Sequence, residues 1–311
     1  MTIEIGLPIP QSSMQALDMA RLRNYLMKSD ALGFDSLWVT EQLFGPGPRL
    51  APVALLSFAA ALTSRAKLGT GILQIALRSP ALLAKTTSTL DHLSGGRLIM
   101  GVAAGSDPAS YRACGLSSER TGAQLEQAVE LLRRFWTEDG VSHDDGRLEI
   151  LDASINPKPV QKPHPPIWFG GSSRIALKRA ARLGTGWMGA GAAPNARYLS
   201  EMTMMRELAA EAGHAPGAFK VGKRVYIAVD SDTARAQFRL REWFGTTYPG
   251  RDPSAVDVLA VSGRPEDCLD QLGSFLESKP DYVVLNPVFD ELEQLDVIAE
   301  ALVPGIRGAR R

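Results

Sequence analysis

Short apolar runs at a regular spacing constrain the fold of this chain more than any other feature. Runs rich in branched residues begin at about positions 3, 36, 67 and 97, and segments of helical periodicity separate them. A step of roughly 30 residues is the size of a unit in which a helix joins two parallel strands. The sequence therefore predicts α/β alternation and a parallel sheet.

The stretch 67–105 shows this unit most clearly. Ser79 and Pro80 suit the N-cap and the first position of a helix, and Gly95 with Gly96 suits its end. The strands on either side end in small residues, at 69–71 and 103–105. Small residues at these ends let a flat or phosphorylated ligand approach the backbone. In parallel α/β folds, ligands bind at this carboxyl edge of the sheet.

The rest of the chain continues the alternation and predicts a closed (β/α)8 barrel, a TIM barrel with insertions, in one domain over 1–311. Strands are expected at 3–8, 36–40, near 67 and 97, and at 167–169, 186–190, 221–229 and 282–287. Helices are expected at about 13–32, from Pro52, from Pro80, and at 119–136, 174–183, 194–212, 232–244, 265–278 and 290–302. Asp230 or Ser231 is the expected cap of the helix over 232–244.

Two segments depart from this alternation of strands and helices. Residues 138–166 contain the turn sequence DDG at 144–146, which predicts a hairpin, followed by five prolines that favour a stiff connection. Residues 245–262 are expected to be irregular and to form part of a lid over a substrate.

Composition narrows the classes of function. Acidic and basic residues balance at 34 each, which argues against a nucleic-acid surface or a polybasic membrane anchor. Cys114 and Cys268 are too few for a disulfide framework, and the N-terminal residues do not resemble a signal peptide. We therefore expect a cytoplasmic protein that is not inserted in a membrane.

Several catalytic classes are disfavoured as well. The four histidines (His92, His143, His164 and His214) lack partners at metal-ligand spacing, so no metal site is predicted. The chain has no GxSxG, P-loop or GxGxxG motif, which disfavours an α/β-hydrolase, a P-loop NTPase and a Rossmann dehydrogenase.

The segment Gly170–Gly171–Ser172–Ser173, directly before a predicted helix, is the best candidate for binding a phosphate. Backbone N–H groups at a helix N-terminus face an anion, glycines allow it to come close, and the two hydroxyls add donors. An ordinary N-cap after a glycine turn explains the same residues, so both interpretations stay open.

Four segments together resemble the bacterial luciferase-like monooxygenase superfamily. They are GFDSLWVTEQ at 33–42, KLGTGIL at 67–73, LRSPALLAKTTSTLDHLSGGRLIMGVAAG at 77–105 and PKPVQKPHPPIWFGGSS at 157–173. The resemblance implies a TIM barrel that binds FMN or the deazaflavin coenzyme F420. It also implies an oxidoreductase that acts on a small organic substrate, with a homodimer as the expected assembly.

The resemblance also assigns residues to the cofactor. It implies a non-proline cis peptide between Gly71 and Ile72 behind the cofactor ring, and a cofactor phosphate near Gly170. The complete set of expected cofactor-binding residues is Gly6, Glu41, Thr70, Gly71, Ile72, Ala104, Gly105, Ser106, Gly170, Gly171, Ser172 and Ser173.

Catalytic residues are harder to assign. In several deazaflavin-dependent relatives a histidine matches Gln42 and a glutamate can match Ser106, so acid–base chemistry of the sugar-phosphate dehydrogenase type is not expected here. Glu41 and Gln42 are the candidates at the end of the second strand, where Glu41 can hydrogen-bond the cofactor ring or remain a solvated carboxylate.

Two cofactors therefore remain open. F420 implies hydride transfer and FMN implies oxygen insertion, and the segments around 67 and 157–168 favour F420. A flavin-binding relative of luciferase without catalysis is the alternative.

Overall fold

A computed structural model describes residues 2–11, 18–45 and 48–308 and contains a closed ring of eight parallel strands. In ring order the strands are β1 (Glu4–Pro8), β2 (Ser36–Val39), β3 (Lys67–Thr70), β5 (Leu98–Ala103), β8 (Ile167–Phe169), β9 (Gly186–Gly189), β10 (Lys220–Val229) and β12 (Tyr282–Pro287). β12 pairs with β1, with Ile5 beside Val283, and this closes the ring. The predicted (β/α)8 barrel is confirmed.

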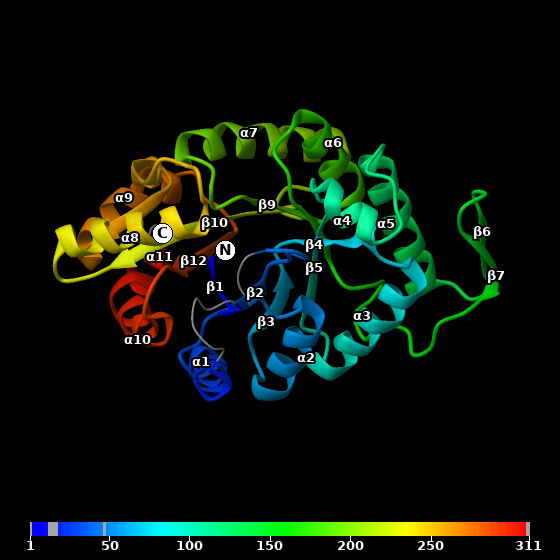
Figure 1. The fold of residues 1–311 in the computed structure, drawn as a ribbon, viewed down its shortest axis with the longest axis horizontal. Coiled ribbons are helices and arrows are strands. Elements are labelled where there is room, and N and C mark those ends of the chain that lie inside the picture. Colours follow the sequence, from blue (N-terminus) through cyan, green and yellow to red (C-terminus); the bar gives the residue numbers. More distant parts are fainter. Residues whose placement is uncertain (1, 12–17, 46–47, 309–311) are drawn as a thin grey trace.

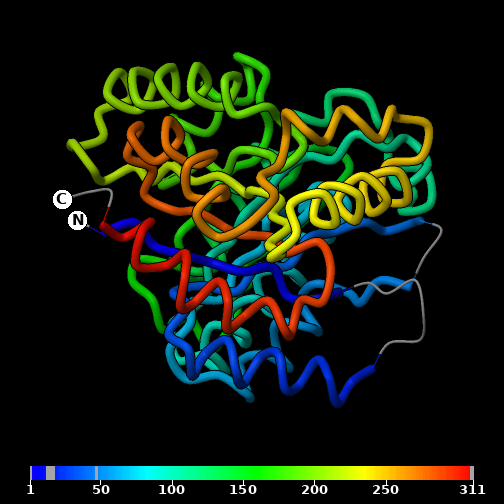
Figure 2. The backbone as a smooth tube through the Cα atoms, turned by 90° about the vertical axis from the view of Figure 1, so that its left-hand side faces the viewer, coloured from blue at the N-terminus to red at the C-terminus, as the bar shows by residue number. Residues whose placement is uncertain are grey.

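Helices surround the ring (Figure 1). They are α1 (Met19–Ala31), α2 (Pro52–Leu62), α3 (Pro80–Ser94), α5 (Thr121–Thr137), α6 (Arg174–Leu183), α7 (Asn195–Glu211), α8 (Thr233–Thr247), α9 (Pro265–Glu277) and α10 (Glu291–Val297). α3 is capped as predicted, because Ser79 accepts a hydrogen bond from the Leu82 N–H and Gly95 ends the helix at φ +65°. Figure 2 shows the last helix lying beside α1, and ion pairs Arg21–Glu293 and Lys28–Asp296 join the two.

Several predicted boundaries were wrong. α1 begins at Met19 after the N-cap Asp18, and the part of the expected helix over 13–17 lies outside the described residues. Asp232, rather than Asp230 or Ser231, caps α8. A short helix, α4 (Pro108–Ala113), was not expected, and Asp107 caps it.

The segment expected to be irregular, 245–262, is more ordered than predicted. α8 continues to Thr247, a 3-10 turn spans Pro253–Val258, and β11 (Ala260–Gly263) pairs with β10 outside the ring. The last helix also continues beyond 302. A π-helical turn at Ile298–Leu302 precedes α11 (Val303–Gly308). Pro304, the second residue of α11, has no N–H to donate to the helix.

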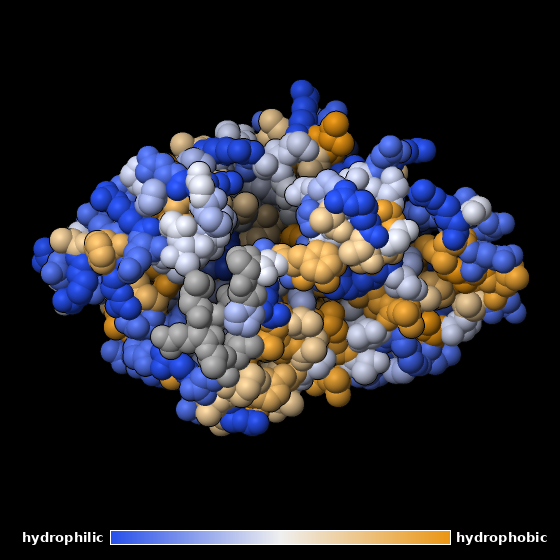
Figure 3. All heavy atoms as spheres, in the orientation of Figure 1, coloured by the Kyte–Doolittle hydropathy of each residue, from blue (hydrophilic) through white to orange (hydrophobic). Residues whose placement is uncertain are grey.

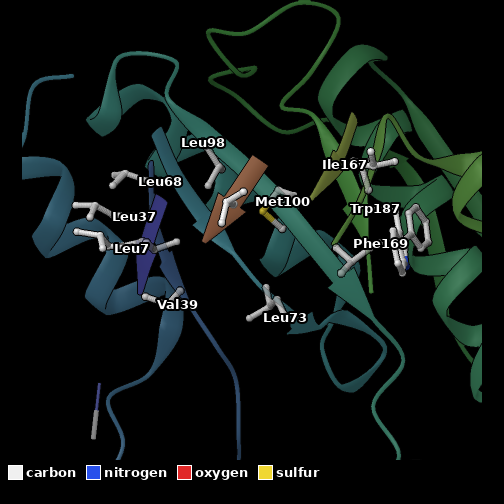
Figure 4. Packing of buried hydrophobic residues seen from close by; sticks show 14 of the residues in the cluster. Leu7, Leu37, Val39, Leu68, Leu73, Leu98, Met100, Ile167, Phe169 and Trp187 are labelled. Atoms are coloured by element: carbon white, nitrogen blue, oxygen red, sulfur yellow. The ribbon is translucent and has the colours of Figure 1, made fainter. Parts of the chain in front are cut away.

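Side chains on opposite faces of the strands form two different layers. Those facing outward, such as Leu7, Leu37, Leu98 and Phe169, pack beneath the helices in one continuous cluster (Figure 4). A separate cluster inside the ring contains Trp38, Ile99, Trp168, Met188, Tyr282 and Val284. Alternation along each strand produces the two layers.

Three aromatic rings fill the inside of the barrel. Trp38 and Trp168 lie with ring centroids 5.6 Å apart, and the Tyr282 ring is 4.8 Å from Trp168. Glycines on the neighbouring strands provide the space, because a Cβ at Gly69 would lie 2.5 Å from Cζ3 of Trp38 and one at Gly186 would lie 2.6 Å from Cε2 of Trp168. The rings therefore form the floor beneath the carboxyl ends of the strands.

The predicted hairpin is confirmed as β6 (Val141–Asp144) and β7 (Glu149–Ala153), which project at the right of Figure 1. The proline-containing connection that follows is fixed to α3. The buried Asp91 carboxylate accepts hydrogen bonds from the Gln161 N–H at 2.9 Å and from Gln161 Nε2 at 2.7 Å. Among the described residues no helix is long and apolar enough to cross a membrane.

Lys223 is an unusual residue of the outer layer, since it is fully buried between β10 and α7. Its Nζ donates to Asn195 Oδ1 at 2.5 Å and lies 5.7 Å from the centre of the Tyr198 ring. Burial lowers the pKa of Lys223 to about 8, and the charge of Glu201 acts in the opposite direction.

This lysine predicts a pH dependence of stability. Between about pH 8 and the ordinary lysine pKa of 10.5 the native state releases the proton while the unfolded chain keeps it. The free energy of unfolding then rises with pH, by at most about 1.4 kcal/mol per unit. Urea denaturation over this range should show the rise in the parent and in the exposed control Lys178→Met, but not in Lys223→Met. Equal slopes in all three would contradict the assignment.

Candidate functional site

A cleft opens at the carboxyl ends of the strands, in the hollow at the middle of the face seen in Figure 3. It encloses about 260 Å³, part of it open to solvent, and its lining residues are Pro8, Trp38, Thr40, Gly71, Met188, Arg224 and Val284. These residues come from six strands or the positions just after them. Most of the lining is apolar, and Thr40 and Arg224 supply the polar groups.

A bulge after β3 forms one wall of the cleft. The peptide bond between Gly71 and Ile72 is cis, which confirms the prediction from the resemblance. The Gly71 N–H donates to the Val39 carbonyl at 2.7 Å, and the Ile72 carbonyl accepts from the Glu41 N–H at 3.2 Å. The chain then forms β4 (Leu73–Gln74), which pairs with β5.

Glu41 holds this bulge from the end of β2. Its side chain is 4% exposed, and Oε2 accepts hydrogen bonds from the Gln74 N–H at 2.6 Å and from Arg78 Nη1 at 3.0 Å. Arg78 Nη2 binds the second oxygen. The carboxylate is therefore not the solvated group that one interpretation expected, and its hydrogen bond to a cofactor ring stays a prediction. Gln42 is exposed just beyond it.

The second predicted segment, Gly170–Ser173, follows β8 and leads into α6. Ser173 caps the helix by accepting from the Ala176 N–H at 3.2 Å, and Gly171 has φ +103°. Trp187 Nε1 donates to the Gly171 carbonyl at 2.7 Å. The first turn of α6 contains no acidic residue, so the positive end of the helix dipole faces this segment without an opposing charge.

Arg197 adds a cation to this segment, and it was not predicted from the sequence. It lies on α7, donates to Ser172 Oγ at 2.7 Å, and is paired with Glu201 one helical turn later. The i, i+4 spacing of Arg197 and Glu201 is visible in the sequence and indicates a helix pair. It does not indicate that α7 starts beside the loop after β8.

The bulge and the loop touch each other. A Cβ at Gly170 would lie 2.8 Å from Cγ2 of Ile72, so a side chain there would displace the bulge. Two segments that are about 100 residues apart in sequence therefore form adjoining parts of one site, as the parallel sheet predicts for the carboxyl ends of its strands.

The remaining predicted residues divide into two groups. Gly105 lies against Gln74 of β4, just after the bulge, since a Cβ there would be 2.9 Å from Cδ of Gln74, and Ser106 is exposed beyond it. The Ala104 carbonyl accepts from the Tyr111 hydroxyl at 2.6 Å. Gly6 and Thr70, in contrast, are buried within the barrel wall.

Gly6 and Thr70 have packing partners within the protein. A Cβ at Gly6 would lie 2.7 Å from Nε1 of Trp38, and the Thr70 hydroxyl donates to the Gly101 carbonyl at 2.7 Å. Their contribution to cofactor binding stays a prediction.

No group of residues suited to a metal ion occurs among the described residues. The ring nitrogens of His92, His164 and His214 lie 2.8 Å from the backbone carbonyls of Lys158, Pro165 and Ala181, and His143 lies 2.8 Å from Gln127 Nε2. The histidines are thus engaged away from the cleft.

The chain is similar in sequence to known proteins. A family model described as luciferase-like monooxygenase matches residues 1–280. An F420-dependent glucose-6-phosphate dehydrogenase of Kineococcus radiotolerans is 27% identical over 256 residues, which cover 79% of this chain and 75% of that enzyme. An FMNH(2)-dependent dimethylsulfone monooxygenase of Pseudomonas putida is 31% identical over 182 residues, which cover 58% of this chain and 48% of that enzyme.

Solved structures show the same fold. An F420-dependent secondary alcohol dehydrogenase, in complex with an F420–acetone adduct, superposes with a TM-score of 0.85 at 21% identity. The superposition covers 99% of this chain and 100% of that one.

Proposed function

Because this chain belongs to the luciferase-like monooxygenase family, we propose that it is an oxidoreductase that binds a reduced flavin or deazaflavin in the cleft. Such a cofactor supplies two electrons, as a hydride from F420 or for the activation of dioxygen with FMN. The protein contributes orientation, exclusion of water and hydrogen bonds to the bound groups.

The observation that carries this proposal is the contact between Gly170 and Ile72. It joins an apolar cleft, suited to a planar ring, to a loop at a helix N-terminus, suited to a phosphate. A flavin or deazaflavin cofactor has this combination of a flat ring and a phosphate that is joined to it by a short chain. The residues that would hold the phosphate are Gly171, Ser172 and Arg197, and the ring would lie near Gly71 and Trp38.

Between the two cofactors we favour F420. The F420-dependent relative matches 79% of this chain, whereas the FMNH(2)-dependent relative matches 58% of it and under half of its own length. Titration of the purified protein with each cofactor, followed by quenching of tryptophan fluorescence, tests the choice. Tight binding of F420 with little affinity for FMN is expected, and the reverse would make the protein a monooxygenase. If neither binds below roughly millimolar concentration, the proposal fails.

No residue is assigned as the proton donor or acceptor of the reaction. The cleft lining contains no histidine and no carboxylate among the described residues, and Glu41 is engaged by Arg78. Tight cofactor binding without turnover of any reducible or oxidisable substrate would support the alternative of a non-catalytic relative.

Arg197 provides a sharper test of the phosphate site. Arg197→Ala removes the guanidinium beside Ser172, and a charge-assisted contact to a phosphate contributes about 1.5–3 kcal/mol. We expect roughly tenfold weaker binding of FMN or F420, and unchanged binding of riboflavin or of the phosphate-free deazaflavin. The matched control is Arg206→Ala on the same helix, whose guanidinium donates to the carbonyls of Ser278 and Lys279. Equal losses for phosphorylated and phosphate-free compounds would place the phosphate elsewhere.

We also propose that residues 1–311 form one domain that acts in the cytoplasm as a homodimer. Cys114 and Cys268 are both free, which suits a reducing compartment. Light scattering on the purified protein tests the dimer directly.

A further inference from the structure

Arg224 places a positive charge in the cleft, and no acidic side chain among the described residues forms an ion pair with it. It lies on β10, and its Nε donates to Asn286 Oδ1 at 2.6 Å, with Nη2 bonded to the same oxygen. Asn286 is buried and donates its own Nδ2 to the Pro287 carbonyl at 2.8 Å, which turns its oxygen toward Arg224. A neutral amide therefore orients this guanidinium and leaves its charge in place.

Arg49 brings a second guanidinium to the same cleft. Its Nη1 donates to the hydroxyl of Thr40, a lining residue, at 2.9 Å. Partial burial lowers the pKa of Arg49, the nearby charge of Arg224 lowers it further, and Tyr248 and Tyr226 act in the opposite direction. Arg224 thus lines the cleft and Arg49 lies beside it, and two like charges placed in this way cost free energy until an anion binds.

Among the described residues, the two arginines have no acidic partner. Neither Arg49 nor Arg224 forms an ion pair with any residue that the structure describes, and positions 5–17 and 42–50 include no Asp or Glu. Arg78 and Arg197, two other arginines at this mouth, each have a carboxylate partner. The Arg49–Arg224 pair differs from these two in the way expected for residues that bind an external anion.

We propose that Arg224 and Arg49 bind an oxyanionic group of the substrate (a carboxylate, sulfonate or phosphate), while the apolar lining holds the rest of the molecule. The residues for that apolar part are Pro8, Met188 and Val284. This inference rests on the proposed function, because it assigns the substrate of the cleft that holds the cofactor. The substrate class is a small organic anion with an apolar body.

The ring order separates this pair from the phosphate loop. The loop follows β8, whereas Arg224 lies on β10, two strands away, and Thr40 follows β2, three strands away in the other direction. The cofactor phosphate and the substrate anion would therefore occupy different parts of the mouth.

The test compares an anion with an uncharged molecule of the same shape. Hexanoate, hexanesulfonate and hexanamide are titrated into protein saturated with its cofactor, and the absorbance change of the bound cofactor reports binding. The same probes are titrated into cofactor-free protein with the shift in Tm as the readout. We expect both anions to bind at least about tenfold more tightly than hexanamide.

Variants assign the preference to the two arginines. Arg224→Gln should remove most of the tenfold preference for the anions, Arg49→Gln should remove part of it, and neither should change the affinity for hexanamide or for the cofactor. Arg147→Gln, in the exposed turn of the β6–β7 hairpin, is the matched control. If Arg224→Gln does not fold, Arg49→Gln decides alone.

Three outcomes would overturn the inference. They are equal binding of anions and amide, an anion preference that survives both substitutions, and a loss of cofactor affinity as large as the loss of anion affinity. The last would assign the pair to the cofactor. The direct cofactor titration separates a failure of the proposed function from these outcomes, because the Tm readout needs no cofactor.

Discussion

Glu41→Ala is expected to lower the free energy of unfolding of the cofactor-free protein by about 3 kcal/mol. The substitution leaves the Arg78 guanidinium without its partner and removes the acceptor of the Gln74 N–H. Removing one member of a buried pair costs more than the pair contributes, because the remaining charge keeps its desolvation penalty. Arg78 is 30% exposed, which places the expected value at the lower end for such pairs.

Chemical denaturation followed by circular dichroism measures this effect. Glu138→Ala is the matched control, because Glu138 forms an exposed i, i+4 pair with Arg134 and should cost less than about 1 kcal/mol. The double variant Glu41→Ala with Arg78→Ala should recover part of the loss. Unchanged stability of Glu41→Ala without cofactor would mean that Glu41 serves the cofactor alone, as the resemblance to the superfamily suggested.

There is a physical explanation for why some predictions from the sequence were confirmed and others were wrong. Strand positions were predictable because each strand carries a buried face, and the spacing of roughly 30 residues recurs whatever the loops contain. The bulge at Gly71 and the loop at Gly170 were predictable as one site because parallel strands place their carboxyl ends together. The strand positions depend on local pattern and on topology alone, whereas the cis peptide after Gly71 was implied by the resemblance to the superfamily.

The cations of the site could not be predicted in the same way. Arg49, Arg197 and Arg224 come from a loop, a helix and a strand, and each meets its partner only after the ring has closed. One signal was available, since alternation along β10 places Arg224 on the same face as Gly222, toward the barrel interior. An arginine on the inward face of a barrel strand indicates a binding role.

The structure of the irregular segments was not predicted for a related reason. Prolines and glycines over 245–263 hide the alternation on which strand prediction depends, so β11 was missed although it pairs with β10. The π-helical turn at Ile298–Leu302 precedes Pro304, which has no N–H to donate to the helix.

Gly69→Ala is expected to destabilise the protein by roughly 3 kcal/mol, at the upper end for an overpacked core. The new Cβ would lie 2.5 Å from Cζ3 and 2.7 Å from Cδ2 of Trp38. That indole cannot move freely, because it is 4% exposed, packs against Trp168 and donates to Ser36 Oγ at 2.8 Å. The substitution therefore costs free energy of unfolding, because a rigid indole has to move rather than the end of a flexible side chain.

The same substitution should also change the binding site, because Trp38 lines the cleft. Displacement of the indole toward the cleft would narrow the space for the ring, so we expect cofactor affinity to fall together with stability. Gly273→Ala, on α9 with nothing within 4 Å of the added Cβ, is the control and should be neutral or stabilising by up to about 1 kcal/mol. Replacing Trp38 by leucine in the Gly69→Ala background should restore part of the stability but not the affinity. If Gly69→Ala matches the control in both measurements, the aromatic floor is less rigid than its contacts indicate.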